Sequence, residues 1–131
     1  MPHLQFDFNK KLNSEQKREL CNLVSISFSE IMQTSKDHIG ILIREHPQDN
    51  LFLGQVNDKS DGILLANIDL RSGRSENQME DFKNQIMQGI KKITQVPIEN
   101  MYIVYSQHQG NDFRLSNRNL NDWFKNENGI R

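Results

Sequence analysis

The order in which apolar residues change their spacing constrains the fold of this chain more than any other feature. Leu4, Phe6 and Phe8 alternate with polar residues, which indicates a half-buried strand over 3–9. Apolar residues then recur at helical spacing from about residue 14 to about residue 34, and a second apolar run follows over 39–43. These segments predict one strand-helix-strand unit.

The same order returns in the second part of the chain. An apolar run over 63–70 predicts a third strand, and Ser75 with Gln78 three residues later is the pattern of a helix capping box. The helix that follows should end before Pro97, and a fourth strand should cover 101–105. The chain therefore predicts two strand-helix-strand units of about sixty residues each.

Two such units predict an α/β (α+β) fold, in which duplicated β-α-β units form a four-stranded mixed sheet with two helices on one face, because crossovers are nearly always right-handed. We expect one domain over 1–131, with pseudo-repeats at about 2–60 and 61–115 and a polar tail over 116–131. The strands read as apolar on both sides, so we expect oligomerisation to cover the open face. A loop over 48–61 has room for a short edge strand at Leu51 to Leu53.

Composition excludes several kinds of partner. Sixteen basic and seventeen acidic residues give a net charge of -1, so no global field favours nucleic acid. No window is apolar over the roughly 18 residues of a membrane span, and the amino terminus does not read as a secretion signal. The single cysteine, Cys21, excludes an intrachain disulfide and suits a reducing cytoplasm as a buried, inert thiol.

The Met-Pro start is the first candidate for chemistry. Removal of Met1 would leave Pro2 with a free secondary amine, and an apolar site with nearby cations lowers the pKa of such an amine toward neutrality. The plain alternative is that Met-Pro is a common start with no role. Because Pro2 opens a predicted core strand, its nitrogen would be held at the sheet edge and would not move freely in solvent.

A basic turn, Arg71-Ser72-Gly73-Arg74, separates the third strand from the second helix. Free backbone N–H groups and the positive end of a helix dipole meet at such a place, and a guanidinium matches the geometry of a carboxylate. The turn is therefore a candidate anion site. A solvated basic turn is the alternative.

Asp37, at the start of the second strand, is either a turn or cap residue or a carboxylate that orients water or a substrate carbonyl. The four histidines show no paired metal-ligand spacing: they are His3, His38, His46 and His108. The chain has no phosphate loop, nucleophile elbow or dinucleotide fingerprint. We therefore predict neither a metal site nor a cofactor.

Pro2 at the start of a strand, the duplicated strand-helix-strand plan and the basic turn together resemble the tautomerase superfamily, which includes macrophage migration inhibitory factor. Two segments, Asn50-Leu51-Phe52-Leu53-Gly54 and Leu70-Arg71-Ser72-Gly73-Arg74-Ser75, resemble cis-3-chloroacrylic acid dehalogenase. Pro2-His3-Leu4-Gln5-Phe6-Asp7, Asp37 and Asn111-Asp112-Phe113 are more similar to malonate semialdehyde decarboxylase. The resemblance covers nearly the whole chain.

The resemblance implies a role for each candidate residue. It implies that Pro2 is the catalytic amine, that Arg71 and Arg74 are catalytic residues that bind the substrate carboxylate, and that Asp37 assists. It places Tyr105 and Phe113 beside the substrate. It also implies a homotrimer.

The predicted function is that of a tautomerase-superfamily enzyme in which an amino-terminal proline transfers protons on a small carboxylate, a 2-keto or enol acid. Malonate semialdehyde decarboxylase-like or hydratase activity is an alternative, as is a non-enzymatic interaction protein similar to the cytokine branch. A third alternative is a ferredoxin-like binding module unrelated to this superfamily. In that case, only residues of the hydrophobic core would surround Pro2.

Overall fold

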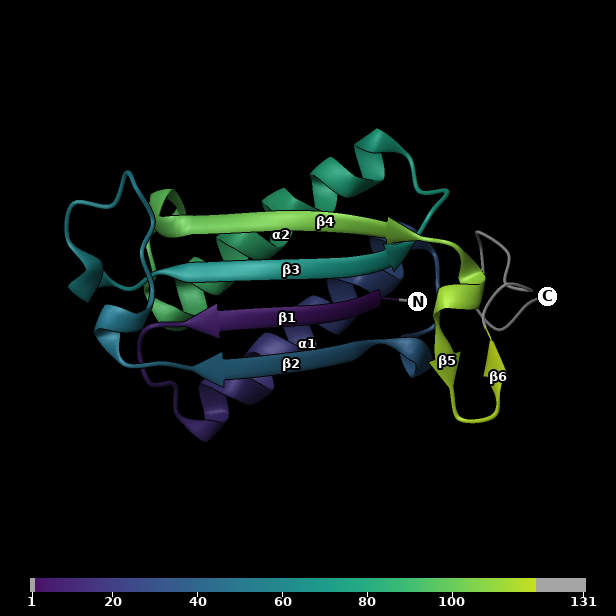
Figure 1. Cartoon of the computed structure of the whole chain (residues 1–131), viewed down its shortest axis with the longest axis horizontal. Coiled ribbons are helices and arrows are strands. Elements are labelled where there is room, and N and C mark those ends of the chain that lie inside the picture. The colour runs from purple at the N-terminus through teal and green to yellow at the C-terminus, as the bar shows by residue number, and fades with distance from the viewer. Residues whose placement is uncertain (1, 120–131) are drawn as a thin grey trace.

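The computed structural model describes residues 2–119, which form a layer of strands and a layer of helices (Figure 1). The main strands are β1 (Pro2–Phe8), β2 (Gly40–Glu45), β3 (Leu64–Arg71) and β4 (Met101–His108). The helices are α1 (Ser14–Met32) and α2 (Glu76–Thr94), and a small hairpin consists of β5 (Arg114–Leu115) and β6 (Arg118–Asn119). The predicted α+β fold class is confirmed. Met1 and residues 120–131 of the expected polar tail lie outside the described residues.

The sheet has the order β2-β1-β3-β4. β1 pairs in parallel with β2, β3 pairs in parallel with β4, and the central β1 and β3 are antiparallel, with Pro2 opposite Leu70. Both helices lie behind the sheet in Figure 1, on one face. This topology brings the starts of β1 and β2 and the ends of β3 and β4 to the same end of the sheet.

Both helices begin with the same hydrogen bonds. The Asn13 side chain accepts from the Gln16 backbone N–H at 2.7 Å, and the Gln16 side chain accepts from the Asn13 backbone N–H at 2.9 Å. Ser75 and Gln78 form the second capping box, with distances of 3.0 and 2.9 Å. Each box satisfies backbone donors that a helix leaves unpaired at its first turn, so these short polar sequences determine where the helices start.

The two halves repeat each other with a constant spacing of 62 residues. α1 and α2 are each 19 residues long, and their first residues, Ser14 and Glu76, differ by this spacing. Both helices end on a glutamine with left-handed backbone, Gln33 and Gln95. The short 3-10 helices follow the same spacing: η1 (Lys36–His38) corresponds to η4 (Ile98–Asn100), and η2 (Gln48–Asn50) to η5 (Gly110–Asp112).

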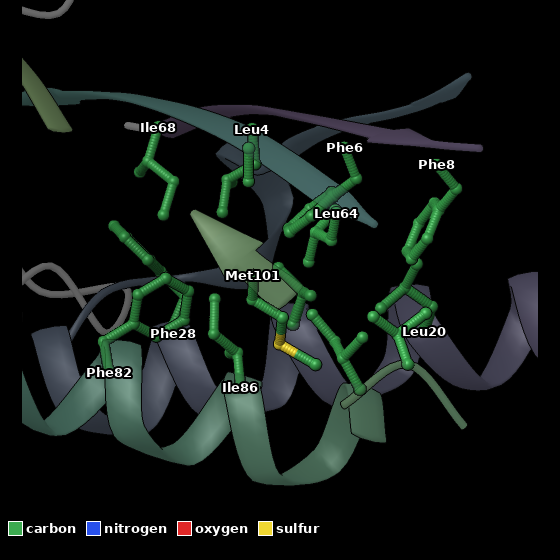
Figure 2. Packing of buried hydrophobic residues seen from close by; sticks show 14 of the residues in the cluster. Leu4, Phe6, Phe8, Leu20, Phe28, Leu64, Ile68, Phe82, Ile86 and Met101 are labelled. Carbon is green, nitrogen blue, oxygen red and sulfur yellow. The ribbon is translucent and has the colours of Figure 1, made fainter. Parts of the chain in front are cut away.

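The core fills the space between the sheet and the helices (Figure 2). Leu4, Phe6 and Phe8 point from β1 toward the helices and have no exposed surface. The rings of Phe28 in α1 and Phe82 in α2 lie edge to face with centroids 5.1 Å apart. Because β1 contributes so much of this apolar surface, the amino-terminal end of the chain is held in place by the core.

The face of the sheet opposite the helices is not apolar as expected. Alternation along the strands places polar side chains there, including Asp7 of β1, Arg44 of β2 and Asp69 of β3. Within the four-stranded sheet, the large apolar side chains that are exposed lie on the outer strands, with Leu42 on β2 and Tyr102 and Val104 on β4. The expectation was wrong because β1 and β3 alternate strictly and bury only one face.

Three local expectations also need correction. β4 continues through Ser106 to His108, because its backbone pairs with β3 as far as Arg71, so the strand is longer than the expected 101–105. Residues 51–53 form no strand, since no neighbouring segment pairs with them, and Phe52 is 84% exposed. Cys21 is only partly buried, because one helical step of about 100° turns it away from the buried Leu20.

Candidate active site

A cavity of about 410 Å³ lies at the end of the sheet where β1 begins and β4 ends. Its walls come from four parts of the chain: the start of β1, the segment from η1 into β2, the end of β3 with β4, and the segment from η5 into β5. The lining residues are Pro2, His3, Asp37, His38, Ile39, Gly40, Asp69, His108, Asp112, Phe113, Arg114 and Leu115. Figure 1 shows these segments meeting beside the N label.

Pro2 is a buried wall residue of this cavity. It is the first residue of β1 and pairs with Leu70, while the next residue, His3, pairs with both Asp69 of β3 and Gly40 of β2. Neighbouring strands on both sides therefore fix the backbone of Pro2. This arrangement differs from a plain surface terminus and from a site surrounded only by core.

Asp37 and Phe113 line the same cavity. Asp37 lies in η1, where its backbone N–H donates to the Ser35 hydroxyl at 3.0 Å, so this cap orients the turn. The Asp37 side chain is exposed. The structure thus brings together three of the predicted site residues, Pro2, Asp37 and Phe113.

Arg71 and Arg74 are not among the residues that line the cavity. Arg71 is the last residue of β3 and Arg74 lies in the connection to α2, at the same end of the sheet (Figure 1). Arg74 donates from Nη1 to the backbone oxygen of Met32, the last residue of α1, at 2.8 Å. Arg74 therefore links the start of α2 to the end of α1, a contact that the sequence did not predict.

Tyr105 lies on the helix side of the sheet, away from the cavity lining. Its hydroxyl donates to the backbone oxygen of Met79 at 2.7 Å, and Lys83 Nζ lies 5.8 Å from the centre of its ring. Burial raises the pKa of the Tyr105 hydroxyl, with a smaller contribution from the nearby negative charge of Glu80. In this single chain, Tyr105 is a donor to α2 and lies apart from Pro2.

Sequence reasoning missed the ionisable group at the end of β4. His108 Nε2 lies 2.8 Å from Asp69 Oδ1, and His108 Nδ1 lies 3.6 Å from Asp112 Oδ2. The His108 ring also meets the Phe113 ring edge to face, with centroids 5.5 Å apart. All four residues line the cavity, so a histidine between two carboxylates shares it with Pro2.

A second ion cluster lies on the open face at the other end of β1. Arg44 donates to both oxygens of Asp7, at 2.7 and 3.0 Å, and His46 Nε2 lies 2.7 Å from Asp7 Oδ1. The Arg44 hydrogen bonds hold the pKa of Asp7 below its ordinary value, with a smaller contribution from His46. None of these three residues lines the Pro2 cavity.

Within residues 2–119, no group of histidine, cysteine and carboxylate side chains is arranged to hold a metal ion. None of the helices described in that range has the length and apolar character needed to cross a membrane.

Comparisons with known proteins agree with this fold. A family model for tautomerase enzymes matches residues 2–57, which contain Pro2 and Asp37. The crystal structure of FG41 malonate semialdehyde decarboxylase inhibited by 3-bromopropiolate is similar, with a TM-score of 0.75 and 14% identity over 87% of this chain and 88% of that chain. The chain thus has the tautomerase fold, and its first strand-helix-strand unit matches the tautomerase family model. The predicted resemblance is confirmed.

Two further solved structures have the tautomerase fold. A member of the cis-3-chloroacrylic acid dehalogenase family is 17% identical, with a TM-score of 0.74 over 88% of this chain and 82% of that chain. A fused 4-OT described as an asymmetric trimer is 18% identical, with a TM-score of 0.77 over 89% of this chain and 94% of that chain. No curated protein matches the sequence of this chain significantly.

Proposed function

We propose that this protein is an enzyme that transfers protons on a small carboxylate, a 2-keto or enol acid, with Pro2 as the catalytic amine. The observation that supports the proposal best is the position of Pro2, buried and held between two strands in the wall of a cavity of about 410 Å³. A cavity of this size admits a small organic acid. The match of residues 2–57 to the tautomerase family model, and the inhibited decarboxylase among the similar structures, support the same class of activity.

The chemistry depends on the state of the Pro2 nitrogen. In a peptide bond to Met1, that nitrogen is a tertiary amide with no basic lone pair and no proton. Once Met1 is removed, neutral Pro2 is a base that can take a proton from a carbon next to a carbonyl, whereas cationic Pro2 is an acid. Removal of Met1 is therefore part of the proposal.

Arg71 and Arg74 remain the proposed carboxylate ligands. Arg71 follows the cavity residue Asp69 by two positions, so it lies on the same face of β3. To reach a substrate, Arg74 must share or leave its bond to Met32. Arg114 already lines the cavity and offers a guanidinium to the same carboxylate. Phe113 lines the cavity and completes the proposed substrate-binding set together with Tyr105, whose hydroxyl must leave its bond to Met79 to reach a substrate.

Decarboxylase or hydratase activity on malonate semialdehyde is the second candidate. It is favoured by Asp37, which lies in the cavity wall with Pro2 and could orient a water or a carbonyl group. Cationic Pro2 serves these reactions, whereas neutral Pro2 serves proton abstraction. The pH dependence of kcat with each substrate class distinguishes the two candidates.

We also propose that the protein is a homotrimer. Tyr102 is 57% exposed on β4 and Phe52 is 84% exposed in the loop before β3, and burial of such side chains favours association. The similar fused 4-OT structure is described as a trimer. Sedimentation equilibrium at micromolar concentration should give three times the chain mass; a stable monomer would contradict the proposal.

The proposed function is tested with turnover and with covalent labelling. The processed protein should turn over phenylpyruvate or malonate semialdehyde, and 3-bromopropiolate, which inhibits the similar decarboxylase, should add its mass at Pro2 in a peptide map. Pro2→Ala keeps a primary amine and should retain part of the activity. Absence of both turnover and labelling would contradict the proposal and favour a non-enzymatic interaction protein.

A further inference from the structure

The structure contains two Asp-His pairs at equivalent places in its two halves. Asp7 and His46 are 39 residues apart and their closest side-chain atoms lie 2.7 Å apart. Asp69 and His108 are also 39 residues apart, at 2.8 Å, and through the same atoms, Oδ1 and Nε2. Each pair joins the last part of an inner strand to the end of the neighbouring outer strand. The pairs differ in their surroundings, since only the second lies in the Pro2 cavity.

The charged neighbours of the two pairs differ. Arg44 makes two hydrogen bonds to Asp7, so the first pair is part of an ion cluster with a guanidinium. The position 62 residues after Arg44 is Ser106, which carries no charge. Asp69 therefore orients His108 without an arginine at the equivalent position.

The two ring nitrogens of His108, which lines the cavity, are held differently. Nε2 lies at hydrogen-bond distance from the Asp69 carboxylate, which favours the tautomer that carries its proton on Nε2. Nδ1 lies 3.6 Å from Asp112, too far for a hydrogen bond, and the Asp112 side chain is 59% exposed. A substrate oxygen can take that place. The backbone of His108 is held as well, because its oxygen accepts from the Ser72 N–H at 2.8 Å.

We infer that His108, oriented by Asp69, is a second proton-transfer group of the Pro2 cavity. The inference rests on the proposed function. In enolisation of a 2-keto acid, neutral Pro2 removes a proton from C3, and that electron pair forms the C2=C3 bond. The carbonyl oxygen takes a proton from Nδ1 of protonated His108, which leaves the ring neutral. Ketonisation reverses these transfers, and water exchanges the protons on both groups afterward.

The two groups are suitably separated for such a substrate. Pro2 is opposite Leu70, and β4 lies one strand farther, so two strand spacings of about 4.8 Å place the backbones of Pro2 and His108 roughly 10 Å apart. A keto acid of three to five carbons, with bonds of about 1.5 Å, spans roughly 4–6 Å. The side chain of His108 covers much of the remaining distance, so one small molecule can contact both groups.

The charged surroundings of His108 come from several elements. Asp69 of β3 and Asp112 of η5 face the ring directly, and Arg71 of β3 is the register partner of His108. The other ionisable groups of the cavity wall are His3, Asp37, His38 and Arg114. The pH dependence of this site is thus a property of the whole cavity, and a test has to compare His108 with a matched histidine elsewhere.

The experiment uses His46 as the matched control, because it makes the same contact with an aspartate outside the cavity. His108→Gln should lower kcat on phenylpyruvate about 100-fold with KM within about three-fold, which is the usual range for loss of a general acid or base. It should also remove one limb of the pH–rate profile, and added imidazole should restore part of the rate of His108→Ala. Asp69→Asn should lower kcat about ten-fold, and His46→Gln should keep the wild-type kcat and profile.

The outcomes separate the two proposals. Wild-type kcat and pH profile in a folded His108→Gln variant, with an active parent, would overturn only the role of His108. An inactive parent that 3-bromopropiolate does not label would overturn the proposed function, and the role of His108 with it. If His108→Gln does not fold, the wild type decides: pyruvate should shift the Nδ1 resonance of ¹⁵N-labelled His108 and leave that of His46 unchanged, and an unshifted His108 would refute the inference.

Discussion

Replacement of Arg74 by alanine should destabilise the fold as well as affect any substrate contact. Arg74 donates to the oxygen of Met32 at the end of α1, where the last turn has no basic residue of its own. A hydrogen bond from a charged donor contributes about 1.5–3 kcal/mol, and a cation at a helix carboxyl end about 0.3–1 kcal/mol. Because the contact is only partly buried, we expect Arg74→Ala to lower the free energy of unfolding by about 2 kcal/mol.

Urea denaturation measures this loss. With an m-value of about 2 kcal/mol/M for a chain of this size, the midpoint should fall by roughly 1 M. Arg74→Lys keeps the charge without the planar fork and should recover about half of the loss. Gln78→Ala removes a neutral donor to Ile31 in the same turn of α1, at 3.0 Å, together with the capping-box bond from the Ser75 N–H, so its loss is the sum of two neutral contacts. An unchanged midpoint together with a raised KM would show that Arg74 is a substrate ligand only and would refute the stabilising role.

Three further outcomes follow from the structure. Protein with Met1 retained should show no proton-transfer activity, because the Pro2 nitrogen is then an amide; intact mass gives the processing state, and equal activity of both forms would exclude amine catalysis. Because Arg44 lowers the pKa of Asp7 in the folded state, the stability that Asp7 contributes is present above its unfolded pKa of about 3.9 and is lost as pH falls through the lower folded value. Urea midpoints of wild type and Asp7→Asn should therefore differ at pH 7 and converge near pH 2, and a constant difference would contradict this linkage. Phe28→Ala, which removes a fully buried ring packed against Phe82, should cost about 3–5 kcal/mol by the same assay, and a loss below about 1 kcal/mol would be inconsistent with that packing.

The parts of the fold that depend on local sequence could be predicted. The capping box of Ser75 and Gln78 involves residues three apart, and the alternation of Leu4, Phe6 and Phe8 is visible over seven residues. The order of these elements was sufficient for the fold class. The end of β4 was predicted too early because Ser106 to His108 are polar, and only pairing with β3 shows that they belong to the strand.

The candidate site could be predicted in part. Pro2 and Asp37 were identified at the ends of predicted strands, and parallel pairing of β1 with β2 brings those ends together. The bond from Arg74 to Met32 could not be predicted, because it depends on how two helices pack. His108 was overlooked although a signal was present: the 39-residue spacing of Asp7 and His46 recurs in Asp69 and His108.

The repeat of 62 residues has a consequence for stoichiometry. The position that corresponds to Pro2 in the second half is Leu64, whose nitrogen is committed to a peptide bond within the chain. A smaller pocket of about 230 Å³, lined in part by Leu51, Phe52 and Leu53, lies among the counterparts of residues 113–115. The end of the sheet beside this smaller pocket has no terminal amine that removal of Met1 could release. Complete labelling by 3-bromopropiolate should therefore stop at one adduct per chain. The residues at that end therefore need not support proton transfer by a terminal amine. Selection for packing or assembly alone can determine how they diverge from their counterparts around Pro2.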